Sequence, residues 1–311
     1  MSRPLLAAIL AISPLLPVSA WAEVPRIVAD IPPVQALVAR VMQGLGEPVL
    51  LVRLGASPHG YALKPSEAAA LNNAQAVFFV GPELTPWLMR PIETLAPNAA
   101  HVELLAAPGT VTLATRTGAT FAPHDPAHED DGHEIGHDHD HEGIDPHAWL
   151  DPENGKAWLT AIAAELSRLD PDNAATYAAN ATAGAAEIDA AELETADRIA
   201  VLGQQRFVAF HDAYQYLENR FGITTTGAVS LSDASTPSPA RIAELRTAIS
   251  DMGATCALSE PQFNADLLKT VFDGSPVKTV VIDPLGSTIP PGPEFYPALI
   301  RSLGEALSAC R

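Results

Sequence analysis

Three predicted β-strands are followed, directly or after a short loop, by a side chain that can bind a metal ion. They are His59 after residues 49–54, His211 after residues 207–210, and Asp283 after residues 278–282. In open α/β sheets, ligands bind beyond the carboxyl ends of the strands. Each residue alone has an ordinary explanation, since a lone histidine can be a cap or a structural residue and Asp283 can close a turn. Together they predict one crevice that holds a divalent cation.

A further histidine, His147, lies in the sequence Asp145-Pro-His-Ala-Trp-Leu-Asp-Pro152. Pro146 and Trp149 predict a tight turn packed on the core, which would fix the imidazole. Three imidazoles and one carboxylate form a four-coordinate set suited to zinc, whereas manganese favours more oxygen ligands. We therefore predict one site, in which a zinc ion is bound by His59, His147, His211 and Asp283.

Other interpretations of these residues are weaker. Glu260, after the predicted strand 255–259, is a reserve ligand, and His101, near the start of a strand, is expected to be structural. An exported zinc hydrolase is the alternative from another class, because three histidines can leave a position open for water. Neither an HExxH motif nor an evident general base lies beside the four predicted ligands. We therefore expect a binding protein and not an enzyme.

Residues 121–145 form an acidic, histidine-rich tract without lysine or arginine. A loop of this length inside a compact domain is typically functional or disordered. Imidazoles and carboxylates both bind divalent metals, although a solvated acidic linker is the plain alternative. Because a disordered tract loses chain entropy on closing around an ion, we expect weak, accessory binding. The histidines concerned are His124, His128, His133, His137, His139 and His141.

The rest of the chain alternates short β-branched runs with amphipathic Ala/Leu-rich segments, which predicts parallel sheets built from βαβ units. Four strands lie on each side of a long helical segment, Pro171 to Gly203, whose apolar residues recur at three-and-four spacing. We expect an α/β protein with two four-stranded lobes joined by this helix. The expected strands are 26–30, 49–54, 76–81, 101–104, 207–210, 224–229, 255–259 and 278–282. The predicted divisions are a signal peptide at 1–22, an N-terminal lobe at 23–171, a linking helix at 172–203 and a C-terminal lobe at 204–311.

The N-terminal residues have the features of a cleaved secretory signal: Arg3, an apolar run and the small-x-small ending Ala20-Trp-Ala22. Without a cysteine at the cleavage point, the exported chain is expected to diffuse freely. The two cysteines, Cys256 and Cys310, favour a disulfide in an oxidising compartment. The formal net charge of −19 makes nucleic acid and anionic membranes poor partners and cations good ones.

Five motifs occur in order along the chain. They are Ser57-Pro-His-Gly-Tyr-Ala-Leu-Lys-Pro-Ser66, Val80-Gly-Pro-Glu-Leu84, Asp145 to Pro152, Phe210-His-Asp-Ala-Tyr214 and Val281-Ile-Asp-Pro-Leu285. At these motifs the chain resembles the substrate-binding proteins of zinc and manganese ABC transporters, the ZnuA/TroA type. The resemblance covers essentially the whole exported chain.

The resemblance implies a periplasmic, monomeric protein that captures zinc between two lobes and delivers it to an inner-membrane ABC permease. It implies ligand roles for His59, His147 and His211, and it matches a family disulfide to Cys256 and Cys310. Manganese members tend to have glutamate where this chain has His211, so that residue favours zinc over a manganese- or iron-binding relative. The histidine-rich tract is expected to gather zinc or to receive it from a periplasmic metallochaperone.

Overall fold

The computed structural model describes residues 24–116, 121, 143–203, 205–230, 240, 243, 247, 253–262 and 277–311. The first lobe contains a parallel sheet in the order β2-β1-β3-β4. Its strands are β1 (Ile27–Ala29), β2 (Val49–Leu50), β3 (Ala76–Phe79) and β4 (Ala100–Glu103). Its helices are α1 (Pro32–Val41), α2 (Pro65–Asn72), the 3₁₀ turn η1 (Pro86–Leu88) and α3 (Met89–Leu95).

The second lobe repeats this plan with a parallel sheet in the order β6-β5-β7-β8. Its strands are β5 (Arg206–His211), β6 (Thr224–Ser230), β7 (Cys256–Ser259) and β8 (Lys278–Val281). Described helices of this part are α6 (Gln215–Phe221) and α9 (Phe295–Ser308). The predicted architecture of two four-stranded parallel sheets is confirmed.

The strand β2 is much shorter than the predicted strand 49–54. The amides of Leu51 and Val52 still donate to β1, at 2.9 Å to Ala29 O and 2.8 Å to Asp30 O. Beyond them the chain bends and reaches Gly55, whose φ of 78° is unfavourable for other residues. The segment between β2 and α2 is therefore longer and less regular than the sequence suggests.

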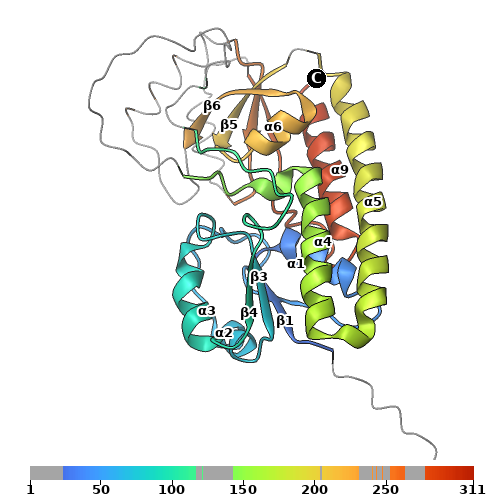
Figure 1. The fold of residues 1–311 in the computed structure, drawn as a ribbon. Helices are drawn as coiled ribbons and strands as arrows, with labels where there is room; N and C mark the ends of the chain where they lie inside the picture. Colours follow the sequence, from blue (N-terminus) through green and yellow to red (C-terminus); the bar gives the residue numbers. More distant parts are fainter. Residues whose placement is uncertain are drawn as a thin grey trace, which may run out of the picture.

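A long helix links the lobes, as predicted. It begins with the 3₁₀ turn η3 (Pro171–Asn173) and continues as α5 (Ala174–Ala200), which lies beside α4 (Pro152–Leu169) and α9 (Figure 1). The predicted apolar stripe is buried, and its members within α5 are Tyr177, Ala181, Gly184, Ile188, Ala191, Thr195 and Ile199. A Cβ on Gly304 of α9 would lie 2.9 Å from the Thr195 methyl group, so these two helices pack at close range.

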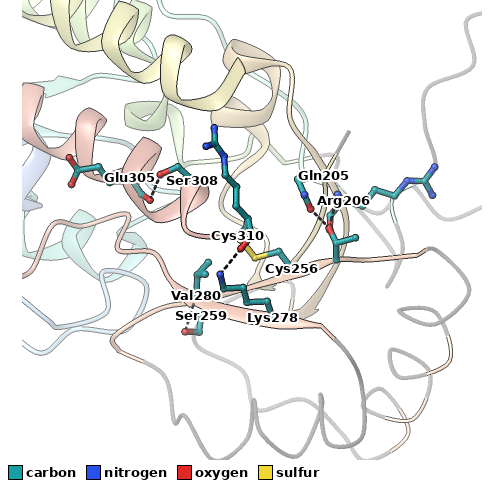
Figure 2. Close-up of a disulfide and its surroundings, with 11 residues drawn as sticks. Gln205, Arg206, Cys256, Ser259, Lys278, Val280, Glu305, Ser308 and Cys310 are labelled. Carbon is teal, nitrogen blue, oxygen red and sulfur yellow. Dashed lines mark hydrogen bonds between the residues drawn. A yellow bond between two sulfur atoms is a disulfide. The ribbon is translucent and has the colours of Figure 1, made fainter. Parts of the chain in front are cut away.

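The predicted disulfide between Cys256 and Cys310 is present, and it joins the start of β7 to the residue that follows the end of α9 by two positions (Figure 2). Lys278, which is paired with Cys256 across the sheet, donates from Nζ to the carbonyl of Arg311 at 2.7 Å. The end of the chain is thus fastened covalently and by a hydrogen bond to the second sheet.

Among the helices of the described ranges, none is long and apolar enough to cross a membrane. The predicted signal peptide, 1–22, lies outside the described residues. The predicted divisions at residues 172 and 204 stay predictions.

Candidate metal centre

Three histidines that are far apart in the sequence meet between the two lobes. His59 comes from the irregular segment after β2, His147 directly precedes the 3₁₀ turn η2 (Ala148–Leu150), and His211 is the last residue of β5. One ligand atom from each lies within 4.8 Å of the others. The ring centroids are 5.5 Å apart for His59–His147, 5.9 Å for His59–His211 and 4.8 Å for His147–His211. Such spacing allows three nitrogens to converge on one ion.

His147 is oriented by the carboxylate of Asp145. The Nδ1 atom of its ring lies 2.7 Å from Asp145 Oδ1, and its backbone amide donates to the same oxygen at 3.0 Å. A carboxylate on Nδ1 favours the tautomer whose Nε2 lone pair can bind a metal. Burial raises the pKa of Asp145 to about 6, although the His147 amide and the positive charge of Arg116 oppose this shift.

The turn that carries His147 is fixed to the second lobe. Trp149 Nε1 donates to the carbonyl of Pro284 at 2.8 Å, and Tyr216 donates from its hydroxyl to the carbonyl of Asp145 at 2.8 Å. Both Trp149 and His147 are buried, as the sequence predicted for this turn. Two of the three histidines are thus held against the same lobe.

His211 has a similar carboxylate partner in Glu260, which follows β7. Its Nδ1 lies 3.2 Å from Glu260 Oε1, and Gln262 donates to the other Glu260 oxygen at 2.7 Å. Both side chains are almost completely buried. The residue predicted as a reserve ligand therefore contacts a candidate ligand, where it can set the tautomer of the imidazole.

Asp283, the predicted fourth ligand, is not part of the three-histidine cluster found among the described residues. Its Oδ1 accepts from the amides of Leu285 and Gly286, each at 3.0 Å. Its Oδ2 accepts from the amide and the hydroxyl of Ser287, each at 2.6 Å. The carboxylate closes the turn after β8, so a metal ion would have to compete with four hydrogen bonds.

Two cavities adjoin the histidines. The smaller, about 10 Å³, is lined by all three histidines and by Glu260, and it has room for roughly one water molecule. The larger, about 300 Å³, reaches His59 and His147 and is also lined by Glu83, Asp145, Asp212 and Arg116. The carboxylates of this larger cavity make it a favourable environment for a cation.

The histidine-rich tract has its six histidines between two segments that line this larger cavity, residues 115–116 and 143–147. Its six predicted metal-binding histidines lie outside the described residues, but the segments that flank it are described. Ala114 and Ile144 form an antiparallel bridge, and the amide of Thr115 donates to Gly143 O at 2.9 Å. Both Thr115 and Gly143 line the cavity.

Arg116 joins one of these flanking segments to the second lobe. Its guanidinium binds the carboxylates of Asp212 and Glu218 and lies 3.9 Å from the centroid of the Phe121 ring. Burial lowers the pKa of Arg116, but the hydrogen bonds to Glu218 and Asp212 outweigh this effect and raise it overall. Asp212 directly follows His211, so this contact places the base of the tract next to a candidate ligand.

Four residues of this region were not predicted as functional from the sequence: Asp145, Arg116, Asp212 and Glu83. The role of Asp145 could have been predicted, since an aspartate two residues before a candidate histidine ligand can reach the Nδ1 atom of that histidine. The positions of Arg116, Asp212 and Glu83 depend on contacts between distant segments. Glu83 and Asp212 lie within motifs that the sequence shares with the family, but those motifs do not show which residues they contact, and Arg116 lies in none of them.

Comparison with known proteins agrees with this architecture and site. The sequence profile of the ZnuA family, described as "Zinc-uptake complex component A periplasmic", matches residues 27–310. The chain is 43% identical to the "High-affinity zinc uptake system protein ZnuA" of Paracoccus denitrificans, over 94% of this chain and 93% of that protein. It is 42% identical to the protein of the same name from Brucella abortus (strain 2308), over 91% of each chain.

Solved structures show the same fold. A crystal structure of ZnuA has a TM-score of 0.71 at 23% identity and covers 92% of this chain and 100% of that one. The binding protein FpvC of Pseudomonas aeruginosa, in complex with Mn²⁺, has a TM-score of 0.77 at 22% identity and covers 93% and 98%. The profile match over nearly the whole chain and the similarity to curated relatives place this protein in the ZnuA family of periplasmic zinc-uptake components.

Proposed function

We propose that this protein captures zinc in the periplasm and delivers it to the permease of an inner-membrane ABC transporter. The observation that carries the proposal is the cluster of the half-buried His59 with the buried His147 and His211 between the lobes. Relatives at 42–43% identity are named for high-affinity zinc uptake. The proposal includes export by the predicted signal at 1–22, action as a monomer and no catalytic activity.

The proposed ligands of the tight site are the Nε2 atoms of the three histidines. Carboxylates on Nδ1 of His147 and His211 direct their Nε2 atoms toward the metal. The small cavity beside Glu260 can hold a water molecule as the fourth ligand. Asp283, the predicted fourth ligand, would reach the ion only by giving up its hydrogen bonds in the turn.

The donor set also supports zinc over manganese. Three imidazole nitrogens suit zinc, whereas manganese is better matched by carboxylates, carbonyls and water. Asp145 and Glu260 supply negative charge around the histidines without replacing them as nitrogen donors. This arrangement lowers the cost of holding a dication while it keeps the ligand sphere rich in nitrogen.

For the histidine-rich tract we propose an accessory role: it gathers zinc, or accepts it from a periplasmic metallochaperone, and passes it to the tight site. Its composition provides weak metal ligands. Thr115, which precedes the tract, and Gly143, near its end, line the cavity that reaches His59 and His147. An ion released from the tract would therefore enter an acidic cavity next to two of the proposed ligands.

Titration of zinc into the purified chain beginning at residue 23 tests the function. We expect one tight site per chain in calorimetry with a competing chelator, followed by weaker binding. A chain that also lacks residues 121–143 should keep the tight step and lose weaker ones. If the chain that keeps residues 121–143 had no tight one-to-one site, the proposed function would be excluded. If the tight site were lost only when residues 121–143 are deleted, the tract would be a source of primary ligands.

Zinc affinity is expected to fall as the pH drops below about 6.5, because protonated imidazoles cannot bind a metal. The pKa of Asp145, raised by burial to about 6, adds to this fall. Above that pH the charged carboxylate supports the Nδ1 proton of His147, and below it the neutral acid does not. Chelator competition between pH 5 and 8, a range set by the titration of histidine, measures the effect. An affinity that stays constant over this range would contradict histidine ligation.

A further inference from the structure

His59 differs from the other two proposed ligands because it lies within a long irregular segment, whereas His147 directly precedes η2 and His211 ends β5. It lies between the end of β2 at Leu50 and the start of α2 at Pro65. A ligand on an irregular segment loses chain entropy when it is fixed on a metal, and this loss lowers affinity. A contact that fixes the segment before the metal arrives removes part of that cost. Such a contact is present on each side of His59.

The first contact is a hydrogen bond from Trp87 to the residue before His59. The indole Nε1 of Trp87 donates to the carbonyl oxygen of Pro58 at 2.7 Å. Trp87 belongs to the 3₁₀ turn η1. The residue after Trp87 in this turn, Leu88, is buried in the core of the first lobe. The indole is therefore anchored to the sheet through its own backbone, and the Pro58 carbonyl is anchored to the indole.

The second contact involves Tyr61, two residues after His59. Its ring packs against the Trp87 ring with centroids 5.5 Å apart and planes tilted by 48°. The Tyr61 hydroxyl donates to Glu67 Oε1 at 2.9 Å, and the other Glu67 oxygen accepts from the amide of Lys64 at 2.7 Å. Glu67 lies in the first turn of α2 and is buried. One indole thus fixes the backbone before His59 and the side chain after it.

We propose that Trp87 is a positioning residue that holds His59 in its metal-binding place before zinc arrives. The inference rests on the proposed zinc-binding function. Carboxylates contact the rings of His147 and His211, and the Trp87 contact restrains the backbone of the segment that carries His59. Trp87 touches no metal in this scheme, and it acts only by keeping His59 near the other two ligands.

The substitution Trp87→Phe tests the hydrogen bond, because phenylalanine keeps an aromatic ring beside Tyr61 and removes the N–H donor. Trp158→Phe is the matched control, since Trp158 Nε1 donates to Thr110 Oγ1 at 3.0 Å and neither residue belongs to the His59 segment. We expect zinc affinity to fall roughly fivefold in W87F, the effect of one net hydrogen bond. We expect the affinity of folded W158F to equal that of the wild type.

A double-mutant cycle with His59→Ala separates positioning from general destabilisation. If Trp87 acts through His59, then W87F should weaken zinc binding when His59 is present and should cause no additional loss in the H59A background. Equal losses in both backgrounds would overturn the inference. Wild-type affinity in W87F, or the same loss in W158F, would also overturn it.

A measurement on the unmodified chain covers the case in which W87F does not fold. Hydrogen exchange of the Trp87 indole N–H, followed by NMR in the metal-free protein, should be slow because the donor is already bonded to Pro58. Fast exchange without zinc that becomes slow with zinc would show that the contact forms only on loading and would refute pre-positioning. If the wild type bound no zinc at all, the proposed function would fail while this exchange measurement still tested the contact.

Discussion

Replacing His211 with alanine is expected to abolish tight zinc binding while the protein stays folded. The substitution removes one of three proposed nitrogen ligands and leaves Glu260 without its imidazole partner. Loss of an outer partner of a metal ligand typically costs about 10–100-fold in affinity, so loss of the ligand itself should exceed that range. Chelator competition followed by calorimetry measures the change.

His101→Ala is the matched control for this experiment. His101 is on β4, its side chain is exposed, and its Nε2 is 2.9 Å from the carbonyl of Ala96. Its removal should leave zinc affinity unchanged. A third variant, His211→Glu, replaces nitrogen by oxygen and should shift the preference from zinc toward manganese. Retention of tight zinc binding in H211A, or an equal loss in H101A, would refute the proposed ligand set.

Removing the disulfide by the double substitution of Cys256 and Cys310 with serine should lower the free energy of unfolding by about 4 kcal/mol. This figure is the chain-entropy value for a loop closed over a sequence separation of 54 residues. Both sulfurs are in buried side chains, so the serine hydroxyls would add a cost of their own. Urea-induced unfolding of the metal-free protein, with and without a reducing agent, measures the loss.

Zinc affinity of the folded serine variant should nevertheless match that of the wild type. Cys256 begins β7, whereas Glu260, the partner of His211, follows the opposite end of that strand. The bond visible in Figure 2 therefore lies at the other end of the sheet from the metal centre. Unchanged stability in the variant would contradict a stabilising role for the disulfide, and a large loss of zinc affinity would show that it also shapes the site.

Much of the fold was predictable because short apolar runs, turns and helical periodicity recur in a regular order. The long helix was the clearest case, since the predicted stripe members within α5 are all buried in the structure. The end of β2 was not predictable from residues 49–54, which are apolar except for Arg53. Leu51 and Val52 are buried and bonded to β1, yet the chain bends there. Buried residues beyond the end of a strand are as apolar as those within it, so the sequence does not show where the strand ends.

The candidate site was only partly predictable. His59, His147 and His211 could be identified because each follows a strand or lies in a rigid turn. Asp283 shares that signal, but an aspartate at a strand end can equally close a turn, and here its oxygens accept four hydrogen bonds from the turn. The roles of Glu260 and Trp87 come from contacts with distant segments, which hydrophobic periodicity does not encode.

The wide separation of the three histidines along the chain has a consequence for the order of folding and metal binding. Because His59 comes from one lobe while His147 and His211 are held by the other, the proposed tight site cannot form until both lobes have folded and joined. An ion that binds only this finished arrangement stabilises it by mass action and leaves unfolded chains without that support. Zinc bound at this proposed site would thus stabilise only the completely folded protein, and an incompletely folded chain could not hold the ion at that site.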